Sequence, residues 1–271
     1  MERRPFSEVL ANAKIDLSRE YERLYFIFNI EDNDSNSWRD ICERFFLQLP
    51  FRGTYLSLSE FDECNGFVFE LPASDFDINY LINYCEYIYN LIVNINQMRI
   101  FSNSRFPDPI EHILGLIEKI GYMIITKNGF SLFVPKSQPA IRVSEMLPSD
   151  ISYKVIEYNH HSMKGDLERK QATLKLLADQ LEARKDELNS INSSLKSDLF
   201  FLFNNINIRH NNVDPKSNSY KKAVADMPDD ELEEWYDRTY DMCLYAFMTL
   251  EQADNKEKIK ALKEKIENSK K

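Results

Sequence analysis

Glycine is scarce in this chain: six of the 271 residues are glycine, and they form no cluster. The loops that hold phosphates in P-loop enzymes and in dinucleotide-binding folds need several glycines at short, fixed spacing, because the backbone must approach the phosphates closely. The sequence contains no such loop. Nucleotide-binding enzymes of these classes are therefore largely excluded.

Cysteine and histidine are also few, with four of each; the cysteines lie far apart, and the adjacent His160 and His161 have no second pair of ligands to complete a usual metal site. The cysteines form no C-x-x-C pair, and zinc sites need three or four such ligands in closely spaced pairs. We therefore expect no metal and no cofactor. No stretch approaches the roughly 20 apolar residues of a membrane span, and the polar N-terminus does not resemble a signal peptide. These features predict a cytoplasmic protein that does not enter a membrane.

Acidic side chains outnumber basic ones by 44 to 34, so the formal net charge is −10. A protein of this charge does not coat itself with nucleic acid through bulk positive charge. Nearly all of the excess lies between Glu31 and Glu86, where twelve acids face three arginines. We call this stretch the acidic segment. The remainder is close to neutral, so any contact with nucleic acid must be local.

The first half of the chain has the apolar spacing of amphipathic helices. Apolar residues three, four and seven apart predict a helix over residues 7–28, and a second helix is expected over 77–100. A third helix begins at Asp108-Pro109, because aspartate caps a first turn and proline favours its first position. Together with the hairpin described next, these helices predict an N-terminal α+β domain over residues 1–147.

A β-hairpin is expected after the third helix. Two apolar strands, over residues 122–126 and 130–134, flank an Asn-Gly pair that favours a type I′ turn. Three basic residues, Lys127, Lys136 and Arg142, lie on or after this hairpin, and no acid occurs between residues 119 and 144. A capped helix followed by a basic hairpin is typical of a winged-helix module that contacts phosphates. The alternative is an ordinary hairpin with solvated lysines.

In the second half, leucine recurs at every seventh position. The six leucines are Leu167, Leu174, Leu181, Leu188, Leu195 and Leu202. Residues 189–194 are rich in asparagine and serine, which are poor helix formers, so we expect a turn there. The pattern fits long antiparallel helices of an intramolecular bundle or, alternatively, an extended coiled coil. With a last helix that opens at Pro228, the predicted fold is mainly α, with a helical bundle over residues 148–271. The lysine-rich tail after Asp254 is expected to be a solvated helix or a frayed end.

A polar cluster follows the apolar helix end at Leu199-Phe200-Phe201-Leu202-Phe203. It contains Arg209, His210 and five asparagines, namely Asn204, Asn205, Asn207, Asn211 and Asn212. An arginine can clamp a phosphate and a histidine can move protons near neutral pH, which is the minimum for metal-free cleavage of RNA. The alternative is that these residues cap the helix and satisfy nearby carbonyls.

An arginine followed by a polar residue, placed where an apolar bundle helix ends, resembles the HEPN superfamily of bacterial abortive-infection and toxin proteins. The resemblance covers about residues 151–250. In that family a histidine follows four to six residues after the arginine, and two protomers form one RNase site. Arg209 and His210 match the first two motif positions, but Val213, Asp214 and Pro215 stand where the later histidine is expected. The resemblance implies a metal-independent ribonuclease with these two catalytic residues, or a non-catalytic relative.

The sequence thus predicts a component of an anti-phage, abortive-infection or toxin-like system that binds or cleaves RNA and forms a homodimer. The residues expected to contact nucleic acid are Lys127, Lys136, Arg142, Asn205, Asn211 and Asn212. One alternative is a non-enzymatic helical protein that binds a partner or a second copy through its bundle. Another is a nucleic-acid-binding regulator of the winged-helix type.

Overall fold

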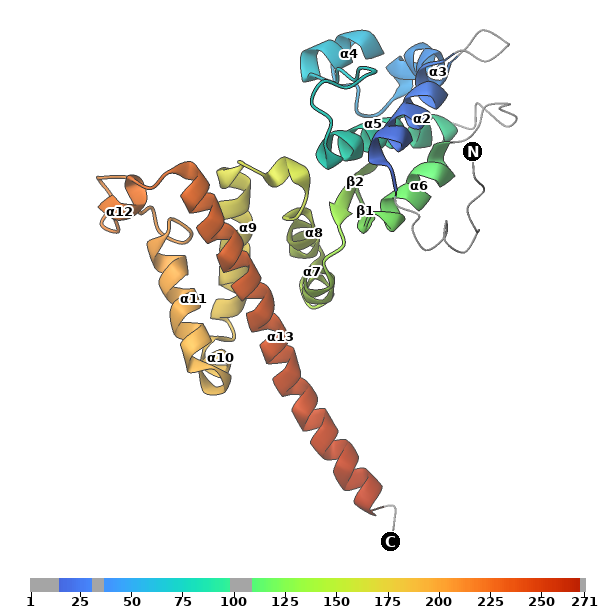
Figure 1. Ribbon diagram of the computed structural model, residues 1–271. Coiled ribbons are helices and arrows are strands. Elements are labelled where there is room, and N and C mark those ends of the chain that lie inside the picture. The colour runs from blue at the N-terminus through green and yellow to red at the C-terminus, as the bar shows by residue number, and fades with distance from the viewer. Residues whose placement is uncertain (1–14, 31–36, 98–108, 269–271) are drawn as a thin grey trace, which may run out of the picture. The chain divides into compact units, whose positions relative to one another are not determined.

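The computed structural model describes residues 15–30, 37–97 and 109–268, which are mainly helical (Figure 1). The chain divides into two compact units, Met1–Phe133 and Val134–Lys271, and each has its own hydrophobic core. The expected fold class, a mainly α chain with a β-hairpin and a C-terminal helical bundle, is confirmed. Within the described residues, no helix has the length and apolar character needed to span a bilayer.

The first unit is arranged around α5 (Ile78–Gln97), against which α2, α3 and α6 all pack. Apolar side chains cover more than one face of α5, so most of its length is buried. The other elements are α2 (Leu17–Asn29), α3 (Trp38–Phe45), η1 (Phe46–Gln48), α4 (Leu58–Asn65), α6 (Pro109–Lys119), β1 (Tyr122–Lys127) and β2 (Phe130–Pro135). Because α5 contacts elements from both ends of the unit, it holds that core together.

The expected helices of this unit are present where they are described, but the first begins later than expected: Ile15 and Asp16 precede it, and the Asp16 side chain caps its first turn. The helix expected over 7–28 appears as α2, with Tyr21, Leu24 and Phe28 buried, while residues 7–14 lie outside the described residues. The helix expected over 77–100 appears as α5, again apart from its last three residues. The capping residue Asp108 also falls outside, although α6 itself begins at Pro109 as expected.

The hairpin turn has the expected backbone. Asn128 and Gly129 have φ angles of 52° and 83°, as a type I′ turn requires. An amide on α5 fixes the hairpin in place: the Asn90 side chain donates to the Ser131 carbonyl and accepts from the Ser131 N–H, both at 2.8 Å. This pair of hydrogen bonds sets the register between α5 and β2.

The second unit is a helical bundle around the N-terminal half of α13 (Asp229–Asn268), which contacts α7, α9, α10 and α11. The other elements are α7 (Gln138–Ser144), α8 (Ser149–Glu157), η2 (His161–Met163), α9 (Leu167–Glu182), α10 (Lys185–Ile191), α11 (Ser193–Asn205) and α12 (Lys222–Ala225). In Figure 1, α9 and α11 run in opposite directions, joined at one end by α10.

The leucine stripe lies inside this bundle. Five of the six leucines are buried and the sixth, Leu167, packs against the core. The chain turns twice along the stripe, at Ala183-Arg184 and at Asn192, where the Asn192 side chain accepts from Leu195 N–H. The second turn falls in the expected range of 189–194. The stripe therefore forms an intramolecular bundle.

The boundary between the units lies at Phe133/Val134, earlier than the expected boundary at 147/148. The reason is α7, whose buried residues Ala140 and Val143 belong to the second core. The polar stretch around Pro148 separates α7 from α8 inside the second unit. A proline-containing turn marks the end of a helix, but it does not show which core each helix joins.

Candidate functional site

Arg209 lies just after α11 and points back towards α9. Its Nη1 donates to Glu182 Oε2 at 2.6 Å, and its Nη2 lies 3.7 Å from Asp179 Oδ1. The hydrogen bond from Arg209 lowers the pKa of Glu182, and Lys185 acts in the same direction. Two carboxylates therefore surround the guanidinium. A phosphate would have to displace them before Arg209 could clamp it.

The expected RNA-contacting asparagines play different structural roles. Asn212 is fully buried, and its side chain accepts from Asn207 N–H at 2.7 Å and donates to the carbonyls of Asn204 and Ser219. Asn205 donates to the Phe201 carbonyl one turn earlier in α11, and Asn211 accepts from Asp214 N–H. These amides hold the loop after α11 in one conformation, which is what the capping alternative expected.

His210 is exposed to solvent beside Arg209. An exposed imidazole is accessible to a substrate, which general acid or base catalysis requires. The charge that would stabilise a phosphate is taken up by Glu182 and Asp179. The two motif residues are neighbours in the sequence, but in the structure Arg209 is directed towards carboxylates of α9, while His210 is exposed to solvent.

The three basic residues expected to contact nucleic acid lie at or after the hairpin. Lys127 ends β1, and Lys127 and Lys136 are exposed. Arg142 is on α7, where it donates to Glu251 on α13 and to Glu145. The hydrogen bond that Arg142 donates to Glu251 is the largest cause of the raised pKa of Arg142. Arg142 therefore connects two helices of the bundle.

The helix before the hairpin carries two exposed glutamates and one exposed lysine. Glu111 and Glu118 are exposed on α6 together with Leu114, and Lys119 is exposed at its last residue. A recognition helix in the major groove of DNA carries donors and basic groups on its outward side. Two outward glutamates on α6 oppose binding to phosphates in that manner.

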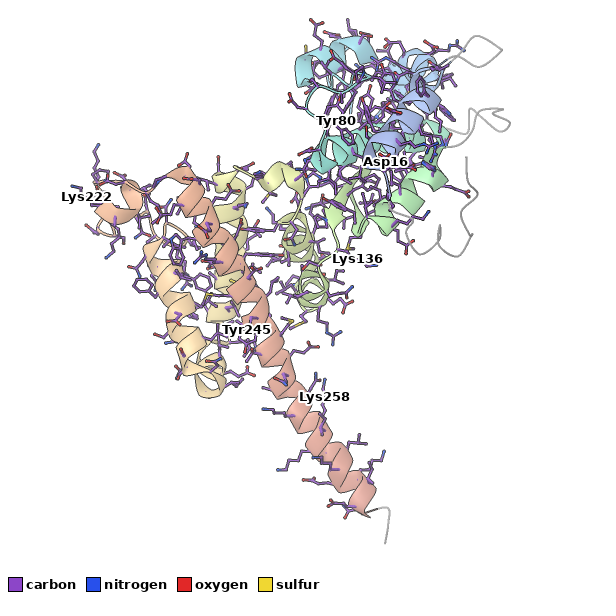
Figure 2. The ribbon with its side chains drawn as sticks, in the orientation of Figure 1. Asp16, Tyr80, Lys136, Lys222, Tyr245 and Lys258 are labelled. Atoms are coloured by element: carbon purple, nitrogen blue, oxygen red, sulfur yellow. The ribbon has the colours of Figure 1, made fainter. Side chains whose placement is uncertain are left out.

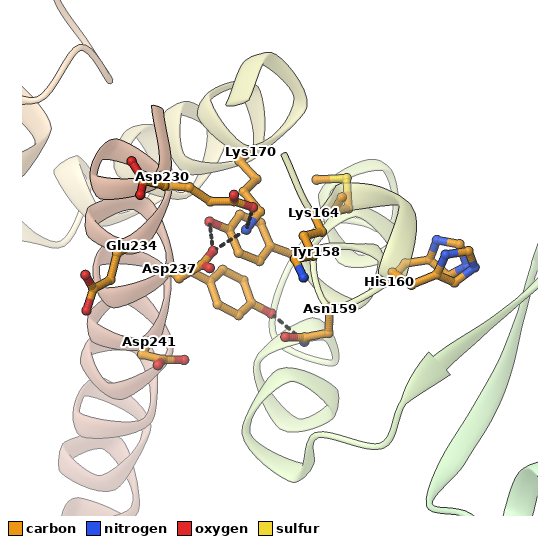
Figure 3. Close-up of a pocket in the computed structure, with 13 residues that line it drawn as sticks. Tyr158, Asn159, His160, Lys164, Lys170, Asp230, Glu234, Asp237 and Asp241 are labelled. Atoms are coloured by element: carbon orange, nitrogen blue, oxygen red, sulfur yellow. Dashed lines mark hydrogen bonds and ion pairs between the residues drawn. The ribbon is translucent and has the colours of Figure 1, made fainter. Parts of the chain in front are cut away.

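A cavity of about 530 Å³ in the second unit lies between α13 and the start of α9 (Figure 3). Lys170 is buried there and pairs with Glu233 at 2.7 Å and with Asp237 at 2.6 Å. The Tyr158 hydroxyl donates to Asp237, and its ring stacks on Tyr240 with centroids 4.0 Å apart. Burial opposes the charged form of Glu233, yet hydrogen bonds from Lys170 and Gly165 N–H hold its pKa below the usual value.

The rim of this cavity is acidic. Asp230, Glu234 and Asp241 line it from α13, beyond the carboxylates that Lys170 neutralises. Burial raises the pKa of Asp241, and the neighbouring Asp237 adds to the effect. This rim would repel RNA phosphates, so the cavity does not resemble an RNA site. The ion pairs of Lys170 with Glu233 and Asp237 instead join α9 to α13.

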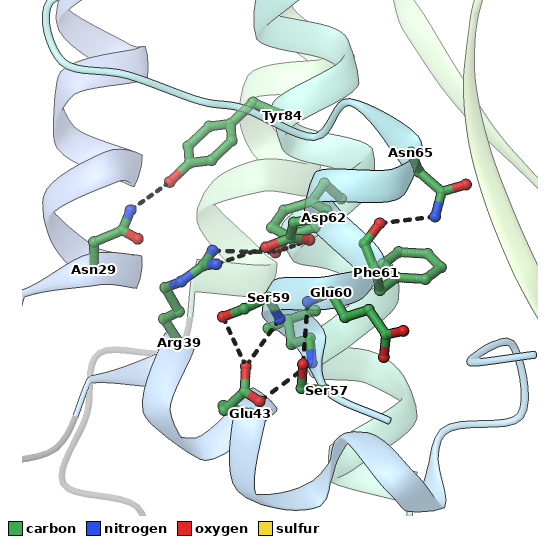
Figure 4. Close-up of polar contacts among 12 residues, drawn as sticks. Asn29, Arg39, Glu43, Ser57, Ser59, Glu60, Phe61, Asp62, Asn65 and Tyr84 are labelled. Atoms are coloured by element: carbon green, nitrogen blue, oxygen red, sulfur yellow. Dashed lines mark hydrogen bonds and ion pairs between the residues drawn. The ribbon is translucent and has the colours of Figure 1, made fainter. Parts of the chain in front are cut away.

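Parts of the acidic segment are used inside the first unit (Figure 4). Asp62 on α4 is buried, and it accepts from Arg39 at 2.6 Å and from the Tyr87 hydroxyl at 2.9 Å. Burial raises the pKa of Asp62 despite these two partners. Glu43 on α3 accepts from Ser59 N–H at 3.1 Å, at the N-terminus of α4. These carboxylates connect helices and are not free to bind a basic partner.

Three of the four cysteines are not suited to act as nucleophiles. Cys42, Cys85 and Cys243 are buried, and burial raises the pKa of all three thiols. Only a thiolate is an effective nucleophile, so these three side chains act as small apolar core residues. Cys64 is exposed on α4.

The end of α13 was expected to be a charged tail, and the apolar side chains on it were not singled out from the sequence. Residues 255–268 continue the helix beyond the bundle, as Figure 1 shows, and Figure 2 labels Lys258 on this part. We call it the distal segment. Three large apolar side chains lie on it, with Ile259 exposed by 51%, Leu262 by 56% and Ile266 by 47%. Their spacing of three and four could have been read directly from the sequence of residues 255–268.

Three comparisons were made with known proteins, and each gave a negative result. No family model, no curated protein and no solved structure matches the chain. The function must therefore be inferred from the chain's own residues and their geometry.

Proposed function

We propose that this chain is a non-enzymatic helical interaction protein that binds another protein through the distal segment of α13. The observation that carries the proposal is the exposed stripe of Ile259, Leu262 and Ile266. Apolar side chains at this spacing form one side of a helix–helix contact, and leaving them in water is unfavourable. The stripe lies beyond Asp254, which pairs with Arg184 at the start of α10 at 3.1 Å.

The geometry around the candidate catalytic residues supports a binding role. Arg209 is paired with Glu182 and Asp179, and the buried cysteines are held as thiols. Asn212, the most buried of the expected RNA contacts, serves the fold of its loop. None of these residues is set up to attack a substrate.

The proposal is tested by photocrosslinking in living cells of the organism whose genome encodes the protein. A benzophenone amino acid at position 262 should give an adduct of one defined mass, and the adduct should disappear when Ile259→Asp and Ile266→Asp are added. The same amino acid at Ile191, which is exposed by 39% on α10, is the matched control. Identical adducts from both positions, or none from position 262, would overturn the proposal.

A second candidate function is RNA cleavage by Arg209 and His210, within a defence or toxin-like system. The observation that favours it is the exposure of His210 immediately after an arginine that is itself not fully buried, with 22% of its side chain accessible. The test is cleavage of single-stranded RNA without metal by the wild type, Arg209→Ala and His210→Ala. Cleavage that is lost in both variants supports this candidate, and equal rates in all three proteins exclude it.

A further inference from the structure

The distal segment carries a narrow apolar stripe. In a heptad frame with Ile259 and Ile266 at position a and Leu262 at position d, the stripe covers only the a and d positions. Tyr245, which is exposed by 54% and labelled in Figure 2, falls at position a two heptads earlier. A stripe of this width is the seam of a helix–helix contact. A helix that lies in a bilayer surface needs a wider apolar face.

Lysines flank the stripe on both sides. The e positions of the distal segment are Lys256 and Lys263, and its g positions are Lys258 and Lys265. All four side chains are exposed. The three glutamates of the segment lie at the b and f positions, on the opposite side of the helix. Every e and g residue that borders the apolar stripe of the distal segment is therefore positively charged.

This charge pattern decides against a second copy of the chain as the partner. In a parallel pair, e residues face g residues of the other helix, and in an antiparallel pair e faces e and g faces g. Both arrangements would place lysine against lysine at every flanking position. Like charges at such positions are destabilising, so the distal segment disfavours association with itself.

The bundle acids nearest to the distal segment, Glu251 and Asp254, are paired with Arg142 and Arg184, and the other carboxylates of α13 in the bundle lie farther away. Fourteen helical residues extend about 21 Å at 1.5 Å per residue, and the Debye length at physiological salt is about 8 Å. The charges of residues 256–265 are thus largely screened from the carboxylates at the other end of α13. A partner approaching the tip experiences a local excess of positive charge, with five lysines against three glutamates.

We infer that the partner of the distal segment is an acidic amphipathic helix, with aliphatic residues along its seam and glutamate or aspartate at the flanking positions. This inference rests on the proposed function and names the chemistry of its partner. Aliphatic residues would cover Ile259, Leu262 and Ile266, and the carboxylates would pair with the four flanking lysines. The lysines give the contact its choice of partner, and the stripe contributes most of its affinity.

The test uses the full chain with 13C-labelled Ile and Leu methyl groups, because methyl NMR detects weak binding. The acidic probe is a three-heptad peptide with Ile and Leu at a and d and Glu at e and g, and the basic probe is its twin with Lys at e and g. We expect the acidic probe to shift the Ile259, Leu262 and Ile266 methyl signals, and the basic probe to leave them unchanged.

A charge-swapped variant makes the test decisive. Changing Lys256, Lys258, Lys263 and Lys265 to Glu should weaken binding of the acidic probe by about tenfold or more. Each ion pair between flanking positions of the two helices contributes little binding free energy, but the four contributions add up. The same variant should gain affinity for the basic probe. The matched control changes Lys175, Lys216, Lys221 and Lys222 to Glu, which are exposed lysines outside α13 and which should leave both affinities unchanged.

The outcomes separate the partner's chemistry from the proposed function. Equal binding of both probes, binding that the charge swap does not alter, or dimerisation of the chain through the stripe in sedimentation would overturn the acidic partner. Methyl shifts caused by vesicles of phosphatidylcholine and phosphatidylserine, with no effect of the acidic probe, would overturn it in favour of a membrane surface. If the crosslink at position 262 forms but the acidic probe fails, only the partner's chemistry is wrong.

Discussion

Asn212 is the residue on which the conformation of the loop after α11 depends. It is fully buried, and its side chain satisfies one backbone N–H and two backbone carbonyls. Asn207 has a φ angle of 61° and returns the contact, since its side chain accepts from Asn212 N–H at 3.1 Å. A run of asparagines in the sequence indicates polar chemistry, but only the fold shows that this chemistry is directed inwards.

The first prediction concerns this residue. Asn212→Ala should destabilise the second unit by about 1–3 kcal/mol, because three buried backbone groups lose their partner. Asn211→Ala, which removes one hydrogen bond at an exposed position, should change the free energy of unfolding by less than about 0.5 kcal/mol. Urea denaturation followed by Trp235 fluorescence measures both. Equal midpoints for the two variants would show that the buried network is not needed.

The second prediction concerns Arg209. Because its hydrogen bond lowers the pKa of Glu182, the Arg209→Ala variant should return that pKa towards the ordinary glutamate value of about 4.3. A carboxyl whose folded pKa is lowered stabilises the folded state above its unfolded pKa, and this contribution is lost as the pH falls through the folded pKa. Arg209→Ala should therefore reduce the acid sensitivity of the second unit.

The measurement is an NMR titration of the Glu182 side-chain carboxyl in both proteins. The control is Lys216→Ala, which removes an exposed lysine from the same loop without touching Glu182. An unchanged titration midpoint of Glu182 in Arg209→Ala would mean that the Arg209 guanidinium does not pair with Glu182 in solution. Arg209 would then be available to bind a phosphate.

At the scale of helices and strands, the hydrophobic pattern predicted most of the fold. The heptad leucines, the hairpin with its Asn-Gly turn and the start of α6 could all be read from local spacing. The first break in the leucine stripe, at Ala183-Arg184, could not, because alanine and arginine are good helix formers. Arg184 is held there by Glu187 and by Asp254 of α13, a contact between residues 70 positions apart.

The candidate site was less predictable for the same reason. Arg209 was placed correctly at the end of an apolar helix, but its carboxylate partners come from α9, 27 residues earlier at Glu182. The apolar stripe of the distal segment was readable from its spacing, whereas its exposure depends on where the bundle ends. Long-range contacts decide both features, and the pattern of a single sequence reports local periodicity.

The third prediction compares two leucines of the same type in different surroundings. Leu181 of α9 is fully buried, so Leu181→Ala should lower the free energy of unfolding of the second unit by about 2–5 kcal/mol. Leu262 of the distal segment is exposed by 56%, so Leu262→Ala should change it by less than about 0.5 kcal/mol. The same denaturation experiment measures both. A large loss in Leu262→Ala would mean that the stripe is covered within the chain itself.

The whole molecule has two hydrophobic cores that share no residue, and the two tryptophans of the chain fall one to each unit. Trp38 is buried in the first core, and Trp235 packs against the second, with the Arg238 guanidinium 5.2 Å from its ring. Replacing either one by phenylalanine leaves a fluorescent probe for the other unit. Apolar burial is the main source of stability and is confined to each core, so each unit should respond to its own core substitutions.

The fourth prediction tests this organisation. With Trp235 as the probe, Leu181→Ala should shift the unfolding transition by an amount that corresponds to about 2–5 kcal/mol, while Leu81→Ala should leave it in place. With Trp38 as the probe the two effects should exchange, because Leu81 lies fully buried on α5 in the first core. Parallel shifts of both probes by either substitution would show that the chain unfolds as one cooperative body. Separate shifts would show that a substitution in one unit leaves the stability of the other unchanged. Under that condition, an effect of substitutions in the distal segment on partner binding cannot arise from unfolding of the first unit.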